Sequence, residues 1–584
     1  MTVLKIKETD CQDCYKCVRF CPVKAIKIKD GHASIIGERC LGDGGCVEIC
    51  PQKAKEVRQD WPVVKDWLEK GEEIIVSLAP SYLVAYRNKS PQNLVNTLYS
   101  LGFKKVEETA IWADYVARAH QELLTMDEKN KNILREKGIF RVKKPVITSS
   151  CPGVVKLIDY YYPHLKEHLA PVLSPMMAHG KYLKEQAPER KVVFVGPCAA
   201  KKEEATRAGY IDAVLTFTEI QELIKSEGNE VEVKQDITPE LATEKGAFFP
   251  ASGGFYKTAG LKVTEIDNKF LTVTGIEKLQ ELFSSFEKVQ NLELIEAMAC
   301  EGGCLAGAFF PDSASLWERR QKLLERIEQQ ERKKIVGEQN LEQNVKLTFM
   351  NLNLDNKTND PEEPDEEDIK KILAKTGKYT EQDELNCGAC GYNTCREKAR
   401  AVYYGWAELE MCLPYMRQRA ESLANKFLES VPNGVVVIDS TFTIQEVNPT
   451  ILEMFNREGV NLIGKTLDEL LTDISHFAEV METQIQKEGK IKHGDRVFEE
   501  LIFPIEDEDL IVGIFSDITE MEKQRKDLKD LKQETLLNAR KVIDKQMRVA
   551  QEIAGLLGET TAETKVTLSR LIDIISGEEE KNDG

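Results

Sequence analysis

The 584-residue sequence lacks any apolar run near the roughly 20 residues that span a bilayer, so it predicts no membrane span. Its first residues, MTVLKIKETD, lack the apolar core of a secretion signal. Positive charge is also in deficit, because 79 Lys and Arg face 98 Asp and Glu, which gives a net charge of -19. Such a chain is not a general nucleic-acid or anionic-membrane binder. These absences predict a cytoplasmic protein with no nucleic-acid or membrane partner.

Long stretches also lack cysteine, and the 15 cysteines fall into three groups. Residues 1–58 hold seven, residues 70–345 hold four, and residues 385–412 hold four. Clustered cysteines in a large chain without a secretion signal do not suit a disulfide scaffold and indicate metal instead. The hydrophobic content of 42% is ordinary for a globular protein. At about 100–200 residues per domain, the length allows roughly three to five domains.

The middle region reads as apolar strands that run directly into loops. PVIT (145–148) precedes Cys151, and KVVFV (191–195) precedes Cys198. Continuous apolar strands that alternate with helices imply a mostly parallel sheet. Ligands of such sheets bind beyond the carboxyl ends of the strands. Both cysteines are therefore expected at a ligand site.

The first cysteine group repeats the spacing C-x2-C-x2-C-x3-C-P from residue 11 and again from residue 40, with one aspartate in the second run. This resembles a two-cluster bacterial ferredoxin domain, in which the fourth cysteine of each run reaches the other cluster. A zinc-ribbon-like site is the alternative, but zinc motifs rarely place Pro after the last cysteine of both halves. The resemblance implies one [4Fe-4S] cluster on Cys11, Cys14, Cys17 and Cys50, and a second on Cys21, Cys40, Cys46 and Asp43.

Asp43 is the departure from the ferredoxin pattern, since it stands where the pattern has cysteine. A carboxylate is a harder ligand than a thiolate. Two outcomes are open for the second cluster: an oxygen-ligated iron, or loss of that iron to give [3Fe-4S].

The second cysteine group lies in TSSCPG (148–153), GPCAAKKEE (196–204) and EAMACEGGC (296–304). In this order the three sequences resemble the signature loops of [FeFe]-hydrogenase, and with the ferredoxin domain the resemblance covers about residues 1–320. It implies an H-cluster, which is a [4Fe-4S] cubane bridged by a thiolate to a two-iron unit with carbon monoxide and cyanide ligands. The matching protein ligands are Cys151, Cys198, Cys300 and the bridging Cys304.

The resemblance implies further residues around the two-iron unit. Lys201 matches a lysine that donates hydrogen bonds to a cyanide, which suits an anionic diatomic ligand; a solvated helix N-terminus is the alternative. Met298 matches a methionine near the bridging carbonyl, with ordinary packing as the alternative. Turn chemistry is the alternative for the other matching positions, which are Ala79, Pro80, Ser81, Ser174 and Pro175.

Several positions depart from the hydrogen-producing enzymes of the family. Ser150 stands where they carry a proton-shuttling cysteine, and a hydroxyl relays protons poorly compared with a thiol of pKa about 8.5. The second loop begins with Gly196 in place of methionine, and Met176 replaces a glutamine. The usual acidic pair is missing from YVARAHQELL (115–124), where Glu122 and His120 titrate and His120 reads as a surface residue. A site with iron ligands but no proton relay should react slowly, which resembles the sensory subgroup.

The third cysteine group reads NCGACGYNTC, then a helix-like stretch, then MCLP. It resembles the single-cluster CxxCG module of several electron-transfer proteins, with zinc as the alternative, and Gly388 and Gly391 would let the backbone approach the sulfides. Four clusters with four ligands each need 16, which the 15 cysteines and Asp43 supply. The implied ligands of the third group are Cys387, Cys390, Cys395 and Cys412.

Residues 421–518 contain no cysteine and begin with NGVVVIDSTFTIQEVNP, which predicts two strands and a helix capped by Asn448. With EELIFPIED and DLIVGIFSDITEMEK as later strands, this resembles a PAS domain, a sensor and dimerisation module. His476 or His493 could ligate haem, but a surface position is the plainer interpretation of each. The domain is therefore expected to act as a relay without a ligand.

The last segment carries a seven-residue repeat, which favours a coiled coil across a homodimer; a lone amphipathic helix is the alternative. No kinase, cyclase or DNA-binding signature follows, so the output is expected to go through an unidentified signalling protein. The repeat positions are Met521, Leu528, Thr535, Val542, Val549 and Leu556.

The predicted fold class is therefore multidomain α/β and α+β. The predicted function is a slow [FeFe]-hydrogenase of sensory type that splits or forms H2, releases or takes up protons, and exchanges electrons with a ferredoxin-like carrier. A metabolic ferredoxin-linked hydrogenase and a non-enzymatic hydrogenase-like iron–sulfur protein, as in certain assembly factors, are the alternatives. The predicted segments are a two-cluster 4Fe-4S ferredoxin domain (1–58), the H-cluster domain (70–345), an acidic linker (346–384), a 4Fe-4S module (385–418), a PAS domain (421–518) and a helical signalling region (519–584).

Overall fold

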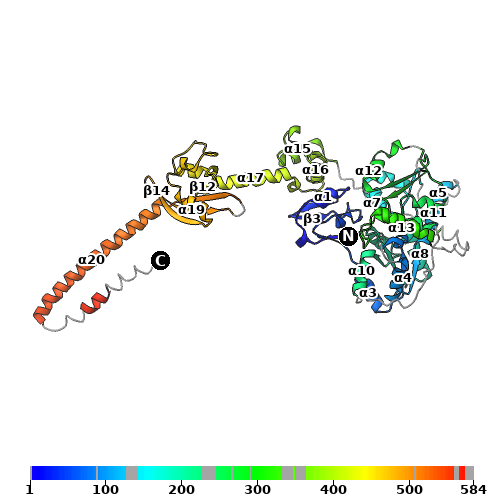
Figure 1. Cartoon of the computed structure of the whole chain (residues 1–584), viewed down its shortest axis with the longest axis horizontal. Coiled ribbons are helices and arrows are strands. Elements are labelled where there is room, and N and C mark those ends of the chain that lie inside the picture. The colour runs from blue at the N-terminus through cyan, green and yellow to red at the C-terminus, as the bar shows by residue number, and fades with distance from the viewer. Residues whose placement is uncertain are drawn as a thin grey trace. The chain divides into compact units, whose positions relative to one another are not determined.

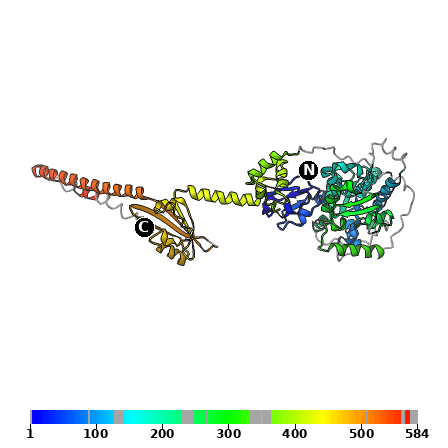
Figure 2. The ribbon, with the colours of Figure 1, turned by 90° about the horizontal axis from the view of Figure 1, so that it is seen from above.

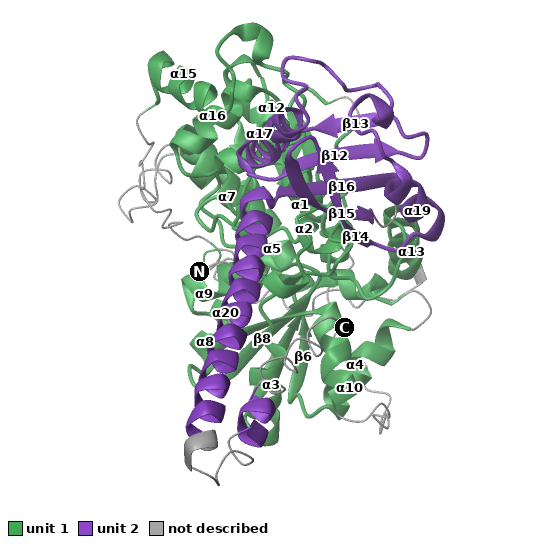
Figure 3. Cartoon of the chain, turned by 90° about the vertical axis from the view of Figure 1, so that its left-hand side faces the viewer, with its two compact units in different colours: residues 1–416 green, residues 417–584 purple. Residues whose placement is uncertain are grey.

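The chain divides into two compact units, Met1–Met416 and Arg417–Gly584, which Figure 3 colours separately. Within the described residues, no helix is long and apolar enough to cross a membrane. The computed structural model describes residues 3–86, 90–126, 142–226, 245–264, 267–289, 291–329, 346, 348, 363–505, 508–557 and 565–571.

The N-terminal segment, blue in Figure 1, consists of two small antiparallel sheets and short helices. β1 (Leu4–Ile6) pairs with β4 (Lys55–Val57), and β2 (Ile26–Lys29) pairs with β3 (His32–Ile35). Its cysteines therefore lie in the loops and helices between very short strands. The helices are η1 (Glu8–Asp10), α1 (Lys16–Phe20) and α2 (Gly45–Glu48).

The middle region contains two sheets in which every neighbouring strand pair is parallel, as the apolar strand pattern predicts. Parallel strands covered on both faces need no polar alternation, and β5, β9 and β11 below are buried throughout. The first sheet has the order β6 (Lys105–Glu108), β5 (Ile74–Leu78), β8 (Lys191–Gly196), β9 (Ala213–Thr216). The second has the order β10 (Phe270–Thr274), β11 (Leu294–Met298), β7 (Val146–Ile147).

Helices follow the strands and pack against them, α8 on β5 and β8, and α7 on β11. The α-helices are α3 (Trp61–Glu69), α4 (Pro91–Ser100), α5 (Ala110–Thr125), α7 (Pro152–Tyr161), α8 (Pro175–Gln186), α9 (Ala200–Ala208), α10 (Phe217–Ser226), α11 (Gly254–Ala259), α12 (Ile276–Ser284) and α13 (Leu316–Gln329). The 3-10 helices are η2 (Pro80–Val84), η3 (Pro163–His168), η4 (Gly246–Phe248), η5 (Phe286–Lys288) and η6 (Cys304–Ala306).

A small helical module follows, in which α15 (Glu366–Lys375) packs against α16 (Cys395–Tyr403). Ile369 and Leu373 of α15 bury against Ala399 of α16, so the predicted acidic linker 346–384 is wrong in its second half. The apolar pair at four-residue spacing gives this acidic stretch a buried helix face. Most of the first half of the linker lies outside the described residues. The module also contains η7 (Glu381–Asp383), η8 (Leu409–Met411) and the start of α17 (Leu413–Ser430).

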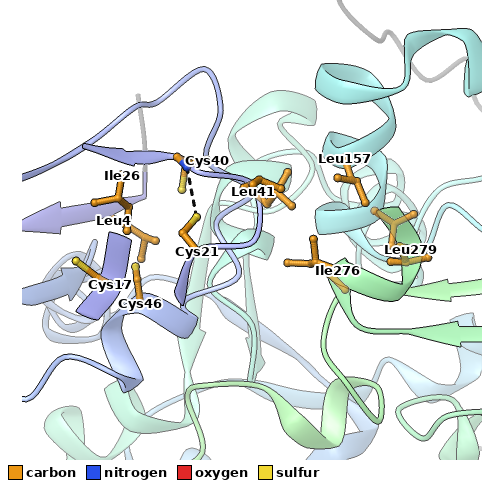
Figure 4. Close-up of a cluster of buried hydrophobic side chains, with 14 of the residues drawn as sticks. Leu4, Cys17, Cys21, Ile26, Cys40, Leu41, Cys46, Leu157, Ile276 and Leu279 are labelled. Atoms are coloured by element: carbon orange, nitrogen blue, oxygen red, sulfur yellow. Dashed lines mark hydrogen bonds between the residues drawn. The ribbon is translucent and has the colours of Figure 1, made fainter. Parts of the chain in front are cut away.

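One apolar cluster joins the N-terminal segment to the middle region and to the helical module. Figure 4 shows Leu41 between the N-terminal cysteines and the side chains of Leu157 and Ile276. Met411 of the module belongs to the same cluster, and the yellow-green module lies beside the blue N-terminal segment in both Figures 1 and 2. The three parts therefore share one core.

The second unit contains an antiparallel sheet, which includes the strands predicted in residues 421–518. Four phenylalanines, Phe455, Phe477, Phe498 and Phe515, contribute to its core. The sheet has the order β13 (Ile444–Val447), β12 (Gly434–Asp439), β16 (Leu510–Asp517), β15 (Arg496–Pro504), β14 (Lys487–His493). Its helices are α18 (Pro449–Met454), η9 (Leu467–Glu469) and α19 (Ser475–Thr483), and Asn448 caps α18 as predicted.

A long helix, α20 (Thr519–Leu557), follows β16 directly. The apolar repeat residues Met521, Leu528, Val542 and Val549 are all exposed along it. The side chain of Leu556 lies outside the described residues. The repeat therefore forms an apolar stripe that nothing in the described part of this single chain covers.

Candidate functional site

Three strand ends bring the middle cysteines together. Cys151 follows β7 and is the N-cap residue of α7, Cys198 follows β8, and Cys300 follows β11. The hydroxyl of Thr148 accepts a hydrogen bond from the amide of Ala297 (3.0 Å), which fixes the first loop against the third. The carboxyl ends of both parallel sheets thus converge on one place, as the strand pattern predicts.

All four middle cysteines line a single cavity, which encloses about 630 Å³ including its solvent-open part. This volume suits a multi-atom group better than one ion. Within the described residues, no three His, Cys, Asp or Glu side chains are arranged to hold a single metal ion. The predicted residues among the cavity lining are Cys151, Cys198, Cys300, Cys304, Lys201, Ser150 and Met298.

Lys201 is held at the cavity wall by two contacts. Its Nζ donates to the backbone carbonyl oxygen of Ser150 (3.2 Å) and forms an ion pair with Glu204 (2.7 Å). Burial lowers the Lys201 pKa, but the Glu204 carboxylate and the neighbouring thiols outweigh that effect, and the pKa is raised. The side chain therefore presents a permanent positive charge to the cavity.

The cavity disfavours free thiolates. Burial raises the pKa of the Cys198 thiol to about 11, and the nearby Cys151 thiol adds to the effect. Burial also raises the pKa of Cys300 well above its usual range. Cluster binding must therefore displace these thiol protons, which makes iron loading dependent on pH.

Two buried hydroxyls support the presence of a further group near these loops. Among the described residues, neither Ser150 Oγ nor Ser81 Oγ has a hydrogen-bond partner. Buried hydroxyls are normally satisfied, so each needs an explanation. A ligand-bearing cluster in the adjoining cavity supplies one for Ser150, and the four-thiol donor set suits iron.

Five predicted residues lie near this region but do not line the cavity as described. Ala79 donates its amide to the Val195 carbonyl oxygen (2.9 Å), which ties the end of β5 to β8. The hydroxyl of Ser174 accepts from the Met177 amide (3.3 Å) and caps α8. Turn and cap chemistry therefore accounts for the observed contacts of Ala79 and Ser174. The others, Pro80, Ser81 and Pro175, lie at the starts of η2 and α8.

Glu296 is a cavity residue that the sequence did not single out. Its carboxylate accepts hydrogen bonds from the amides of Gly253 (2.9 Å) and Phe255 (3.0 Å) and from the Thr272 hydroxyl (2.8 Å). Burial nevertheless raises its pKa to about 7. The cavity wall therefore contains a carboxyl group that titrates near neutrality.

The prediction that His120 is a surface residue is wrong. Its side chain is completely buried in α5, with Nδ1 2.7 Å from the Val116 carbonyl oxygen, and it packs edge-on against Phe255. Burial lowers its pKa to about 4, so it is neutral at physiological pH. In the same helix Glu122 is exposed, and burial raises the pKa of Asp114 to about 7.

The N-terminal cysteines show interactions that follow the predicted ligand sets. Burial is the main cause of the raised pKa of Cys17, and the nearby Cys11 and Cys14 thiolates raise it further. Burial, the Asp43 carboxylate and neighbouring thiols raise the pKa of Cys40 to about 11, and Cys21 is among those thiols. Each of these thiols thus interacts with partners of its own predicted set.

Asp43 lies close enough to Cys46 and to Cys300 of the cavity for its charge to affect both thiols. Burial raises its pKa, and its Oδ2 accepts from the Gly45 amide (3.1 Å). The N-terminal segment also contacts α7 of the middle region, where Lys156 donates a hydrogen bond to the Cys40 carbonyl oxygen (3.0 Å).

The four cysteines of the third group also line one pocket, together with two buried lysines. Lys378 donates from Nζ to the sulfur of Cys412 (3.4 Å), and Lys398 donates to the Leu409 carbonyl oxygen (3.0 Å). The sequence did not predict a role for either lysine, and Lys378 lies in the segment that was predicted to be a linker. The cysteines are Cys387, Cys390, Cys395 and Cys412.

Both histidines of the second unit are partly exposed to solvent. His476 pairs with the buried carboxylate of Glu500, and His493 packs against the ring of Phe455 with centroids 5.2 Å apart. Packing and an ion pair account for both side chains.

Four family models match successive parts of the chain. They describe a 4Fe-4S dicluster domain at residues 3–51, the C-terminal domain of the iron only hydrogenase large subunit at 72–308, an Fe-S cluster at 383–414, and a PAS fold at 428–523.

Curated relatives include hydrogenases and assembly factors. The NADP-reducing hydrogenase subunit HndD of Solidesulfovibrio fructosivorans is 26% identical over 331 residues, 47% of this chain and 56% of the relative. Iron hydrogenase 1 of Clostridium pasteurianum is 28% identical over 383 residues, 53% of this chain and 65% of the relative. The cytosolic Fe-S cluster assembly factor NAR1 of Botryotinia fuckeliana is 26% identical over 239 residues, 36% of this chain and 39% of the relative. The chain thus spans less than two thirds of each of these relatives.

Among solved structures, a variant of the [FeFe]-hydrogenase of Chlamydomonas reinhardtii matches with 20% identity and a TM-score of 0.35, covering 44% of this chain and 88% of that one. The family matches and the hydrogenase relatives agree with the cavity of cysteines at residues 151–304. The chain therefore contains a domain of the iron only hydrogenase large subunit at residues 72–308 and a PAS domain at residues 428–523.

Proposed function

We propose that this protein is a slow hydrogen sensor that holds an H-cluster in the cavity of residues 148–307 and signals through its PAS domain. The carrying observation is that four cysteines and Lys201 line one cavity in which serine stands at position 150. When bound, the H-cluster supplies the iron chemistry that splits hydrogen heterolytically. Weak proton delivery leaves a site that detects hydrogen more readily than it consumes it.

The chain's own residues would have distinct tasks. Cys151, Cys198, Cys300 and Cys304 hold the iron, and the fixed charge of Lys201 attracts an anionic ligand. The Glu296 carboxyl is the titratable cavity group that can hold a proton near neutrality.

Electrons would leave through the ferredoxin clusters and the module of residues 385–412. The helix α17 begins at Leu413, directly after Cys412, and ends four residues before β12 of the PAS domain. A signal needs an element with two states, and the junction of β16 and α20 near Asp517 is the candidate. The exposed apolar stripe on α20 would pack against the same stripe of a second copy and form a homodimer.

Infrared spectroscopy of the maturated protein, with and without hydrogen, tests the proposal. Bands of iron-bound carbon monoxide and cyanide that change under hydrogen are expected. Complete absence of these bands would favour the second candidate, a non-enzymatic iron–sulfur protein, which the similarity to the NAR1 assembly factor supports. Turnover as fast as that of metabolic hydrogenases would instead favour a ferredoxin-linked metabolic enzyme.

A further inference from the structure

The helical module is docked on the ferredoxin domain through a defined face. Lys27 of β2 pairs with Glu408 (2.6 Å) and donates to the Gly405 carbonyl oxygen (3.0 Å). The guanidinium of Arg39 lies 3.8 Å from the ring centroid of Trp406, a cation–π contact. Charged and aromatic contacts thus fix the module against residues 1–58.

Gly391 is a point of close approach between the module and the ferredoxin domain. A Cβ at this position would lie 2.8 Å from the Val18 side chain and 3.0 Å from the Val18 carbonyl oxygen. Val18 follows Cys17 in α1, and Gly391 follows Cys390 in the module. Only a residue without a side chain lets these two cysteine-bearing segments meet so closely.

Aromatic side chains fill the rest of the face. Tyr392 is buried in the same apolar cluster as Cys17 and Cys21, and Cys390 packs against that cluster. Arg39 also reaches this face, over the ring of Trp406. The two groups of cysteines therefore meet across a contact that is apolar between Val18, Tyr392 and Cys390.

Two lysines are buried in the pocket wall of the module, whereas the N-terminal cysteines have the buried Lys55 beside Cys17. Lys378 is 8% exposed and donates directly to the Cys412 sulfur. Lys398, on α16, is 6% exposed and lies in the same pocket. Hydrogen bonds to cluster sulfurs and nearby positive charge favour the more negative, reduced form of an iron–sulfur cluster.

We propose that the module at residues 385–412 is the electron-accepting end of the cluster chain, with its reduction potential raised by Lys378 and Lys398 and its electron supplied across the Val18–Gly391 face. In the step, one electron leaves a reduced ferredoxin-domain cluster, which is oxidised, and enters the module cluster, which is reduced; no bond is made or broken. The inference rests on the proposed function for its physiological source, hydrogen, whereas dithionite supplies the electron in the tests. The proposal adds that the electron released by hydrogen oxidation is held on the module cluster, directly before α17.

The potential of the module cluster tests the lysine part. In full-length protein loaded with [4Fe-4S] clusters but without the two-iron unit, EPR-monitored titration of Lys378→Met should show one cluster shifted to more negative potential. Lys378→Arg should restore part of the shift, and Lys370→Met, an exposed position on α15, should leave all potentials unchanged. Unshifted potentials in both Lys378→Met and Lys398→Met would overturn the tuning role. Because no hydrogen is used, missing carbonyl bands would defeat the proposed function alone.

A matched glycine pair tests the route. Gly391→Ala should weaken the spin coupling between the reduced module and ferredoxin clusters and slow reduction of the module. Gly31→Ala carries similar backbone strain, since both glycines have positive φ, but nothing lies within 4 Å of the added Cβ, so coupling should persist. Lys27→Met weakens the same face without touching the cluster loop and should act like Gly391→Ala. Unchanged coupling in both face variants would overturn the route.

Discussion

Lys201 donates a hydrogen bond from Nζ to the backbone carbonyl oxygen of Ser150, 3.2 Å away. This contact joins the two positions that the resemblance to [FeFe]-hydrogenase associates with proton transfer and with cyanide binding. The Ser150 hydroxyl takes no part in this contact and has no partner among the described residues. A side-chain change at residue 150 therefore leaves Lys201 in place, so the relay can be tested separately.

Ser150→Cys should raise hydrogen evolution, because a thiol ionises far more readily than a hydroxyl. The acidic pair upstream is also missing, so the gain should remain below the roughly 10²–10⁴-fold of a positioned acid or base. Ser149→Cys is the matched control, since the Ser149 hydroxyl already donates to the Val172 carbonyl oxygen (2.6 Å). Assays across pH that show no gain in Ser150→Cys would place the limiting step elsewhere.

Asp43→Cys should convert a labile or high-spin cluster signal into an ordinary [4Fe-4S]⁺ signal. The reason is that thiolate binds iron of such clusters better than the harder carboxylate. EPR of reduced, anaerobically loaded protein measures the change, with iron content as a check on loading. An identical spectrum in the variant would remove Asp43 from the ligand set.

Most of the predicted cluster ligands follow from the spacing of the cysteines, because short loops limit which thiols can reach one cluster. The cavity cysteines, Lys201 and Ser150 could be named in advance since each belongs to a local sequence at a strand end. The parallel sheets also followed from local pattern, as apolar strands such as residues 191–195 and 213–216 need cover on both faces.

Other features depend on contacts that no local pattern contains. Glu296 became a cavity residue because β10 and β11 pair in the register that sets Thr272 opposite it. His120 is buried because α5 packs on both α8 and α11. Lys378 faces Cys412 across 34 residues of sequence, so its acidic surroundings along the chain were misleading.

Glu296→Gln should flatten the dependence of stability on pH. The folded-state pKa of Glu296 is raised to about 7, from 4.5, by burial. Its contribution to the free energy of unfolding is therefore full below about pH 4.5 and is lost as pH rises through about 7. At 1.36 kcal/mol per pKa unit, the free energy of unfolding changes by about 3 kcal/mol. The midpoint of urea unfolding between pH 5 and 8 measures this slope.

Glutamine cannot ionise, but its amide would face one of the backbone donors, so its absolute stability should be lower at every pH. Glu301→Gln is the control, because Glu301 is exposed beside the same loop. Equal slopes in wild-type and Glu296→Gln proteins would mean that Glu296 does not titrate in this range.

Val542→Glu combined with Val549→Glu should split the proposed dimer. Both side chains are exposed on the seven-residue stripe of α20, and a charge buried in a helical seam costs several kcal/mol, a large part of the stability of a short coiled coil. Hydrogen oxidation with an artificial acceptor should persist, because the cysteine sites lie in the other compact unit. Light scattering and dye-coupled oxidation measure the two effects.

The control for this pair places the same charges on the opposite face of α20. Gln533→Glu with Gln551→Glu changes exposed residues two positions from Thr535 and Val549, about 200° around the helix, and should leave the mass unchanged. A dimer that survives the valine changes would make α20 a solvent-facing helix. Loss of oxidation together with the dimer would mean that the cluster domains need this helix to fold, because the chemistry itself uses no residue of the second unit.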